Sequence, residues 1–177
     1  MIVKVKPYKR PAFAKLLNYM LDKKSKILNR NGESFVITHN LRGEEIENWV
    51  EQFQENEKRR QYNHKKKNYL THEIISFHRD DVKNISLDKM EDMAREYIQL
   101  RNPNGMYVAV PHFDKEHYHI HFCLSAIEYK SGKSLRMSKQ QFQELKKNIQ
   151  KYQQEKFPEL SKSVVEHGKK GIHISDK

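Results

Sequence analysis

The chain has 177 residues, of which 34 are Lys or Arg and 23 are Asp or Glu, so its formal net charge is +11. This length suits one domain with a sizeable core. The positive charge favours a polyanionic partner, with nucleic acid ahead of an anionic membrane surface. The sequence contains no apolar run near the roughly 18 residues of a membrane span and no signal peptide, and its one cysteine excludes an internal disulfide. We therefore expect a cytoplasmic protein without membrane insertion.

Hydrophobic spacing predicts strands and helices in the order β-α-β-α-β-α-β-β-α. The strands are expected at about residues 1–6, 35–38, 69–78, 106–111 and 120–124. The helices are expected at about residues 11–22, 43–60, 87–98 and 138–156. Pro7 and Pro11 are expected to frame a turn. In the first helix, Tyr19 lies on the border of the apolar stripe.

A strongly basic segment follows the second predicted helix. Its candidate DNA-backbone contacts are Lys58, Arg59, Arg60, Lys65, Lys66 and Lys67. A run of charge is usually a solvated face, but in a basic chain it also suits phosphate contacts, which are electrostatic and independent of base sequence.

The most distinctive stretch runs from His112 to His121 and holds four histidines and two carboxylates in ten residues. Alternate residues of a strand share a face, so His119 and His121 point to the same side, and His117 joins them if the strand begins early. His112 ends the preceding strand and can supply a third imidazole. Three neutral imidazoles with open coordination positions are typical of a catalytic metal site.

The short link after His112 requires its two flanking strands to be antiparallel. We therefore expect an α+β fold with a central, mainly antiparallel sheet of about five strands and helices packed around it, on the face opposite the histidines. Residues 1–160 are expected to form this domain, and residues 161–177 a basic, flexible tail.

The pattern His-x-Asp-x-x-His-x-His-x-His between two strands resembles the third motif of the MobA/VirD-type relaxases. These are HUH (His-hydrophobic-His) single-strand nickases of plasmid and transposon mobilisation. The segment 13–21 is similar to their early helix with its nucleophilic tyrosine. The segment 72–78 is similar to their second motif, in which a serine near the strand end contacts DNA. The resemblance spans roughly residues 1–157 and implies a mainly antiparallel sheet with helices around it.

The resemblance also implies roles for single residues. Tyr19 is expected to attack the scissile phosphate and to remain joined to the 5′ phosphate, leaving a free 3′ hydroxyl. The expected metal ligands are His112, His119 and His121, and Asp114 is expected to orient one of their imidazoles. His117, Ser76 and Ser125 are each expected to contact either one of the metal ligands or the DNA. Ser125 stands where the family usually has Asn.

The implied activity is metal-dependent, site- and strand-specific nicking and rejoining of single-stranded DNA at a transfer origin, which initiates conjugative mobilisation. A divalent ion acts there as a Lewis acid. Its identity is open among Mn, Mg, Zn, Ni and Co, although imidazole ligands suit Mg least. The implied partners are the single-stranded origin DNA, accessory mobilisation proteins and a coupling protein, and we expect a monomer.

Three alternatives stay open at this point. In a rolling-circle replication initiator or an HUH transposase, the nucleophile follows the histidines, and the candidate is Tyr152 with Lys156 four residues later, where Tyr-x-x-Lys is usual. A non-enzymatic, basic DNA-binding module would hold a structural metal with four ligands. A metal-dependent hydrolase would cut DNA with water and leave no protein attached.

Overall fold

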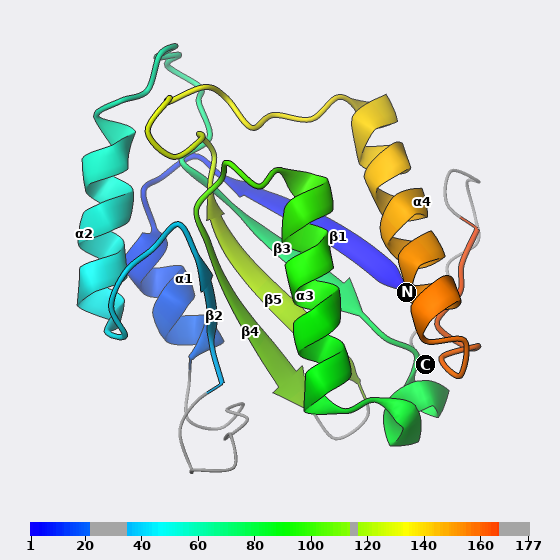
Figure 1. Ribbon diagram of the computed structural model, residues 1–177. Helices are drawn as coiled ribbons and strands as arrows, with labels where there is room; N and C mark the ends of the chain where they lie inside the picture. The colour runs from blue at the N-terminus through cyan, green and yellow to red at the C-terminus, as the bar shows by residue number, and fades with distance from the viewer. Residues whose placement is uncertain (22–34, 114–116, 167–177) are drawn as a thin grey trace.

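The computed structural model describes residues 1–21, 35–113 and 117–166 (Figure 1). Its strands are β1 (Ile2–Tyr8), β2 (Ile37–His39), β3 (Leu70–Ser76), β4 (Tyr107–Phe113) and β5 (Tyr118–Ser125). Its helices are α1 (Phe13–Met20), α2 (Ile46–Glu57), α3 (Leu87–Arg101) and α4 (Lys139–Lys156), together with a 3-10 helix, η1 (Arg79–Asn84). The predicted order is confirmed, and η1 is an addition to it. No helix in these ranges is long and apolar enough to cross a bilayer.

The five strands form one antiparallel sheet in the order β1-β3-β5-β4-β2. In the β4–β5 hairpin, His112 lies opposite His119. In the β3–β5 pair, Ser76 lies opposite His119 and Ile74 lies opposite His121. Directly opposite residues of antiparallel strands share a face. The sheet therefore turns the predicted ligands and Ser76 to one side, and the expected α+β fold is confirmed.

Helices cover both faces of the sheet, whereas the sequence predicted them on one face only. α3 and α4 pack on the face that carries Ile120 and Phe122 (Figure 1). α1 and α2 pack on the other face, where the rings of Phe13 and Phe53 stack with centroids 4.5 Å apart. The reason is that part of the histidine face is apolar, with Val110 buried there under α1 and α2. The rest of that face carries the imidazoles.

β1 runs through Pro7 to Tyr8, two residues past its predicted end, and the chain bends at Lys9 and Arg10, between the two prolines. Pro7 lies opposite Thr71 of β3. β1 is an edge strand, and an edge strand can include a proline because one side of its backbone needs no hydrogen-bond donor.

Two predicted helix starts are confirmed by their caps. The Ser86 side chain accepts a hydrogen bond from the Lys89 amide at 3.2 Å. Ser138 and Gln141 form a reciprocal capping box at the start of α4. Each cap satisfies amides that have no partner inside the helix.

The packed part of the chain extends past residue 160, the boundary that the sequence predicted. Ser163 is buried, and its hydroxyl donates to Asp81 Oδ2 at 2.6 Å while accepting from the His78 amide at 2.9 Å. The remainder of the predicted tail, residues 167–177, lies outside the described residues.

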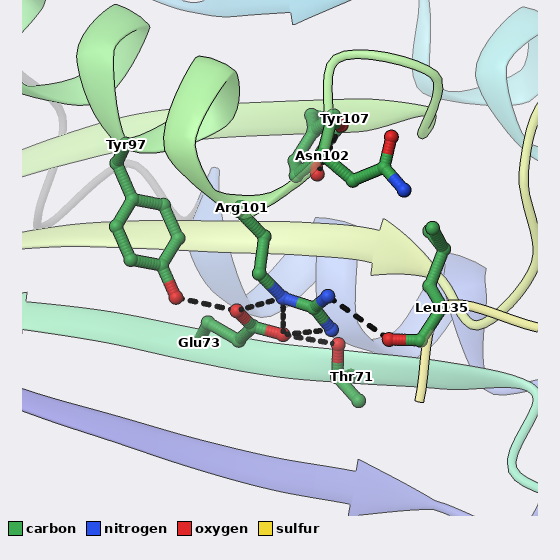
Figure 2. A network of polar contacts seen from close by, with 7 residues as sticks. All are labelled: Thr71, Glu73, Tyr97, Arg101, Asn102, Tyr107 and Leu135. Carbon is green, nitrogen blue, oxygen red and sulfur yellow. Dashed lines mark hydrogen bonds and ion pairs between the residues drawn. The ribbon is translucent and has the colours of Figure 1, made fainter. Parts of the chain in front are cut away.

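A buried ion pair fixes β3 to α3 (Figure 2). The side chain of Glu73 is fully buried, and Arg101 Nε donates to its carboxylate at 3.0 Å. The hydroxyls of Tyr97 and Thr71 donate to the same carboxylate at 2.5 and 2.7 Å, and Arg101 Nη1 donates to the Leu135 carbonyl at 2.9 Å. A buried pair repays its desolvation only when its remaining polar atoms are also bonded. Here the network supplies those bonds.

Arg101→Met is expected to lower the free energy of unfolding by about 3–5 kcal/mol, because it leaves the Glu73 carboxylate buried without a cation. Urea denaturation followed by circular dichroism measures this change. The control is Lys58→Met, which removes the partner of Glu55 in a fully exposed pair and should leave the free energy of unfolding close to the wild-type value. Equal losses in the two variants would contradict a special contribution of the buried pair.

Candidate active site

Four imidazoles gather on the part of the sheet that carries Ser76. The ring centroids of His112 and His121 lie 4.1 Å apart, and those of His119 and His121 lie 6.0 Å apart. The fourth imidazole is His72 of β3, whose ring lies 5.1 Å from that of His121 at an interplanar angle of 24°. The predicted ligands are therefore brought together, with one additional histidine.

His72 is a site residue that the sequence analysis missed. It is 7% exposed, and its Nε2 lies 2.8 Å from His121 Nδ1. One signal was available, because His72 and Ser76 are four residues apart in one strand and so share a face. The sequence did not show that β3 pairs with β5 in the register that brings His72 next to His121.

The hydrogen bonds constrain which ring nitrogens carry protons. His112 Nε2 lies 2.6 Å from the Met20 carbonyl oxygen, which can only accept, so Nε2 is the donor and a neutral His112 has its lone pair on Nδ1. His119 Nδ1 lies 2.9 Å from Ser76 Oγ. These bonds tie β4 to the end of α1, and β5 to β3.

Burial keeps two of these imidazoles neutral. It lowers the pKa of His121 to about 2, with further lowering by the neighbouring His112. It lowers the pKa of His72 to about 4, with a smaller contribution from Lys6. Neutral imidazole is the form that binds a metal ion.

In their present orientations, the four imidazoles do not form a metal-binding site. Among the described residues, no set of three or more His, Cys, Asp and Glu side chains is arranged to hold a metal ion. His112 Nε2 is turned to Met20, and His72 and His121 share a hydrogen bond. The residue types suit a metal, since neutral imidazoles are good ligands for several divalent transition ions.

Tyr19 stands beside the cluster. Its side chain is 61% exposed, while Phe13, Leu17 and Met20 of α1 face the core. The Tyr19 ring lies edge-on to His121, with centroids 6.1 Å apart and an interplanar angle of 76°. It lies equally close to His72, at 6.2 Å and 75°. The predicted border position thus places an accessible phenol next to the imidazoles.

The other candidates divide between near and far positions. His117 is half-buried just before β5, with its ring 6.0 Å from that of His119. Ser125 is buried at the opposite end of β5, and its hydroxyl accepts from the Ile127 amide at 3.3 Å. Ser125 thus lies four residues beyond His121 on β5, and its hydroxyl is engaged within its own end of the strand. Asp114 lies outside the described residues.

Tyr152 is on the wrong side of the sheet to act with the histidines. It belongs to α4 and packs against the core on the opposite face. Its hydroxyl donates to Asp92 Oδ1 at 2.5 Å, and burial and this bond raise the pKa of Tyr152. The arrangement excludes Tyr152 as the nucleophile of this cluster.

The predicted basic segment is only partly available to DNA. The Arg60 side chain is 9% exposed, and its guanidinium bonds to the Glu57 carboxylate and the Asn68 carbonyl. Arg60 therefore stabilises the end of α2, and little of its side chain is exposed for a DNA contact. Lys58 is exposed but paired with Glu55 at 2.9 Å. The exposed members of the segment are Arg59, Lys65 and Lys66, and Lys67 is half-buried over the Tyr69 ring.

Two further basic features were not predicted. Lys4 and Lys6 are exposed on β1 opposite Ile74 and His72, and so lie on the histidine face. A groove of about 770 Å³ lies at the other end of β3, on the opposite face that carries Thr71 and Glu73, and the described residues that line it include no Asp or Glu. Its cationic lining residues are Lys9, Arg60, Lys66, Lys67, Arg101, Arg136 and Lys139.

The family comparison agrees with this arrangement. The family model described as "Relaxase: MobA/VirD2-like, nuclease domain" matches residues 19–156. The chain belongs to this relaxase family. The matched range begins at Tyr19 and includes His72 and all of the 112–121 histidines. The chain is thus a relaxase nuclease domain, an enzyme that nicks DNA in plasmid and transposon mobilisation, as its sequence predicted.

Solved structures share the relaxase fold at low sequence identity. The MobM relaxase domain (MOBV; Mob_Pre) bound to 26-nucleotide pMV158 oriT DNA has a TM-score of 0.57 and 13% identity, covering 99% of this chain and 95% of its own. A Mn-bound crystal structure of the same domain with 23-nucleotide oriT DNA has a TM-score of 0.55 and 18% identity, covering 99% and 92%. A structure on vancomycin resistance transfer in Staphylococcus aureus has a TM-score of 0.58 and 15% identity, covering 92% and 95%. A comparison with curated proteins found no match.

His112→Ala is expected to lower the free energy of unfolding by about 1–3 kcal/mol, because the Met20 carbonyl loses a buried donor. His112→Gln keeps an N–H group of similar reach and should lose less. Amide hydrogen exchange in α1 reports the local effect, with faster exchange in the Ala variant than in the Gln variant. Wild-type exchange rates in His112→Ala would show that this bond does not hold the end of α1.

Proposed function

We propose that this relaxase nicks one strand of DNA at a transfer origin by attack of Tyr19 on the scissile phosphate. The observation that carries the proposal is the exposed Tyr19 ring, edge-on to His121 at 6.1 Å on the histidine face of the sheet. The family match supports it, because the matched range contains both the tyrosine and the histidines. The proposed substrate is single-stranded DNA, as the resemblance to single-strand nickases implies.

A divalent metal is the second part of the proposal, with His112, His119 and His121 as its ligands. A bound divalent ion would polarise the scissile phosphate and offset its charge. The donor set supports Mn, Zn, Ni or Co above Mg, and a Mn-bound MobM relaxase domain is consistent with this choice. His112 would coordinate through Nδ1, or would exchange its bond to Met20.

The bond changes at Tyr19 follow from its position. The phenol loses its proton, and its oxygen attacks phosphorus while the bond to the 3′ oxygen breaks. The 3′ oxygen takes up a proton, and the 5′ phosphate stays on Tyr19. One phosphodiester replaces another, so the 3′ hydroxyl of the same or another end can reverse the step. His117, just before β5, is proposed to assist, and the sequence-based proposal that Asp114 orients one of the imidazoles is kept.

The DNA backbone is proposed to contact exposed lysines beside the histidines. Lys4 and Lys6 project from the edge strand on the same face as His72. Past the end of β1, Lys9 Nζ donates to the Lys66 carbonyl, and Lys65 and Lys66 are exposed there. The basic groove opens on the opposite face of the sheet, so it is not part of this set of contacts. Such contacts position a strand without reading its bases.

Tyr19→Phe is expected to abolish the covalent adduct, because it removes the attacking oxygen. The assay incubates labelled single-stranded origin DNA with the protein and Mn²⁺, then resolves protein-bound DNA on a denaturing gel. Tyr152→Phe is the matched control, since it removes an equivalent hydroxyl on the opposite face and should leave the adduct at the wild-type level.

The other outcomes discriminate between the remaining functions. An adduct lost only in Tyr152→Phe would contradict the proposal and favour an initiator or transposase mechanism. Cleavage with no adduct would indicate attack by water. DNA binding without cleavage, on DNA that a related relaxase cuts in the same assay, would indicate a binding module.

The Lys4→Ala/Lys6→Ala double variant is expected to bind single-stranded DNA with a weaker salt dependence. Each lost phosphate contact should reduce the slope of log Kobs against log salt concentration by about 0.7. Fluorescence anisotropy over a salt series measures the slope. Lys151→Ala, on the exposed side of α4, is the control and should keep the wild-type slope. An equal reduction of the slope in both variants would show that the effect comes from the net charge of the protein and not from contacts of Lys4 and Lys6 with the DNA.

A further inference from the structure

β3 supports both histidines of the His-x-His motif through the same ring atom. His72 Nε2 lies 2.8 Å from Nδ1 of His121. Ser76 Oγ lies 2.9 Å from Nδ1 of His119. In each of these two imidazoles, Nδ1 is engaged by β3.

Strand geometry explains why the two contacts come as a pair. His119 and His121 are two residues apart on β5, and Ser76 and Ile74 lie directly opposite them. Ser76 is thus beside His119, whereas the longer side chain of His72 reaches diagonally to His121. On its other face, β3 is held by the buried Glu73–Arg101 pair. Both supporting side chains therefore project from a fixed strand and are themselves at most 7% exposed.

A neutral imidazole has one N–H and one lone pair, so a contact at one nitrogen determines what the other can do. A proton on Nδ1 leaves the lone pair on Nε2. Metal-binding histidines usually donate the N–H of the other ring nitrogen to a nearby acceptor, which fixes ring orientation and tautomer. The lone pair of His72 Nε2 and the oxygen of Ser76 can both act as that acceptor.

We propose that His72 and Ser76 are positioning residues that hold the proton on Nδ1 of His121 and His119, so that both rings present Nε2 to a divalent metal ion. This inference rests on the proposed metal-dependent function and deepens it. Of the two roles that the sequence left open for Ser76, it favours contact with a metal ligand over contact with DNA. His112 differs from His119 and His121, because its Nε2 already donates to the Met20 carbonyl.

The tautomers can be measured without metal. Two-dimensional ¹H–¹⁵N NMR of the ¹⁵N-histidine-labelled chain in EDTA reports which ring nitrogen carries the proton. We expect protonated Nδ1 in both His119 and His121. His72→Leu should change the signals of His121 and spare His119, whereas Ser76→Ala should do the reverse, so each variant is the control for the other. A proton on Nε2 of His121 in the wild type would overturn the proposal for His72.

Metal affinity provides the second test. Electron paramagnetic resonance of free Mn²⁺ measures binding to the whole chain, with thermal unfolding as the check on folding. His72→Leu and Ser76→Ala should each weaken binding by about 10–100-fold. His72→Gln, which places an acceptor near the former Nε2, and Ser76→Thr, which keeps the hydroxyl, should bind within a few-fold of the wild type. His39→Leu, which removes an imidazole bonded to the Pro103 carbonyl outside the cluster, should not change binding.

The outcomes separate this inference from the proposed function. If the wild type binds Mn²⁺, His119→Ala does not, and His72→Leu and Ser76→Ala bind normally, the positioning roles are overturned while the metal site stands. If the wild type itself does not bind Mn²⁺, Zn²⁺, Ni²⁺ or Co²⁺, the metal site and the positioning roles fall together. A His72→Leu chain that does not fold leaves Ser76→Ala, a much smaller change, to decide the same point at His119.

Discussion

The pairing of β5 with both β3 and β4 is the constraint on which the site depends. It places His112 opposite His119 on one side, and Ser76 opposite His119 on the other. A slip of one residue in either pair would turn the affected side chains to the other face of the sheet. The apolar residues that alternate with the histidines oppose such a slip, because Ile120 and Phe122 would then leave the core beneath α3 and α4.

β3 combines two kinds of polar burial on its two faces. On the side of α3, Glu73 is bonded by Arg101, Tyr97 and Thr71, so its charge is matched within the core. On the other side, His72 is kept neutral by burial beside a second imidazole. The first arrangement anchors the strand to α3, and the second leaves His72 with a lone pair that can accept a hydrogen bond. Both are needed if β3 is to orient the histidines of β5.

The sequence predicted the parts of the site that local periodicity determines. Strand alternation placed His119 and His121 together, and helical spacing placed Tyr19 at the border of an apolar stripe. It could not determine features that depend on pairing between distant segments. His72 joined the cluster through the β3–β5 register, and Lys4 and Lys6 joined the histidine face through the β1–β3 register. In the same way, the sequence does not show that Glu57 and Asn68 engage the guanidinium of Arg60.

The central claim is that Tyr19 becomes covalently attached to DNA. The most direct measurement is mass spectrometry of the trapped adduct after digestion with nuclease and trypsin. The account predicts a nucleotide phosphate on the tryptic peptide 16–23, which contains Tyr19 as its one tyrosine. A modification on the peptide that contains Tyr152, or on a histidine of the 112–121 segment, would contradict it.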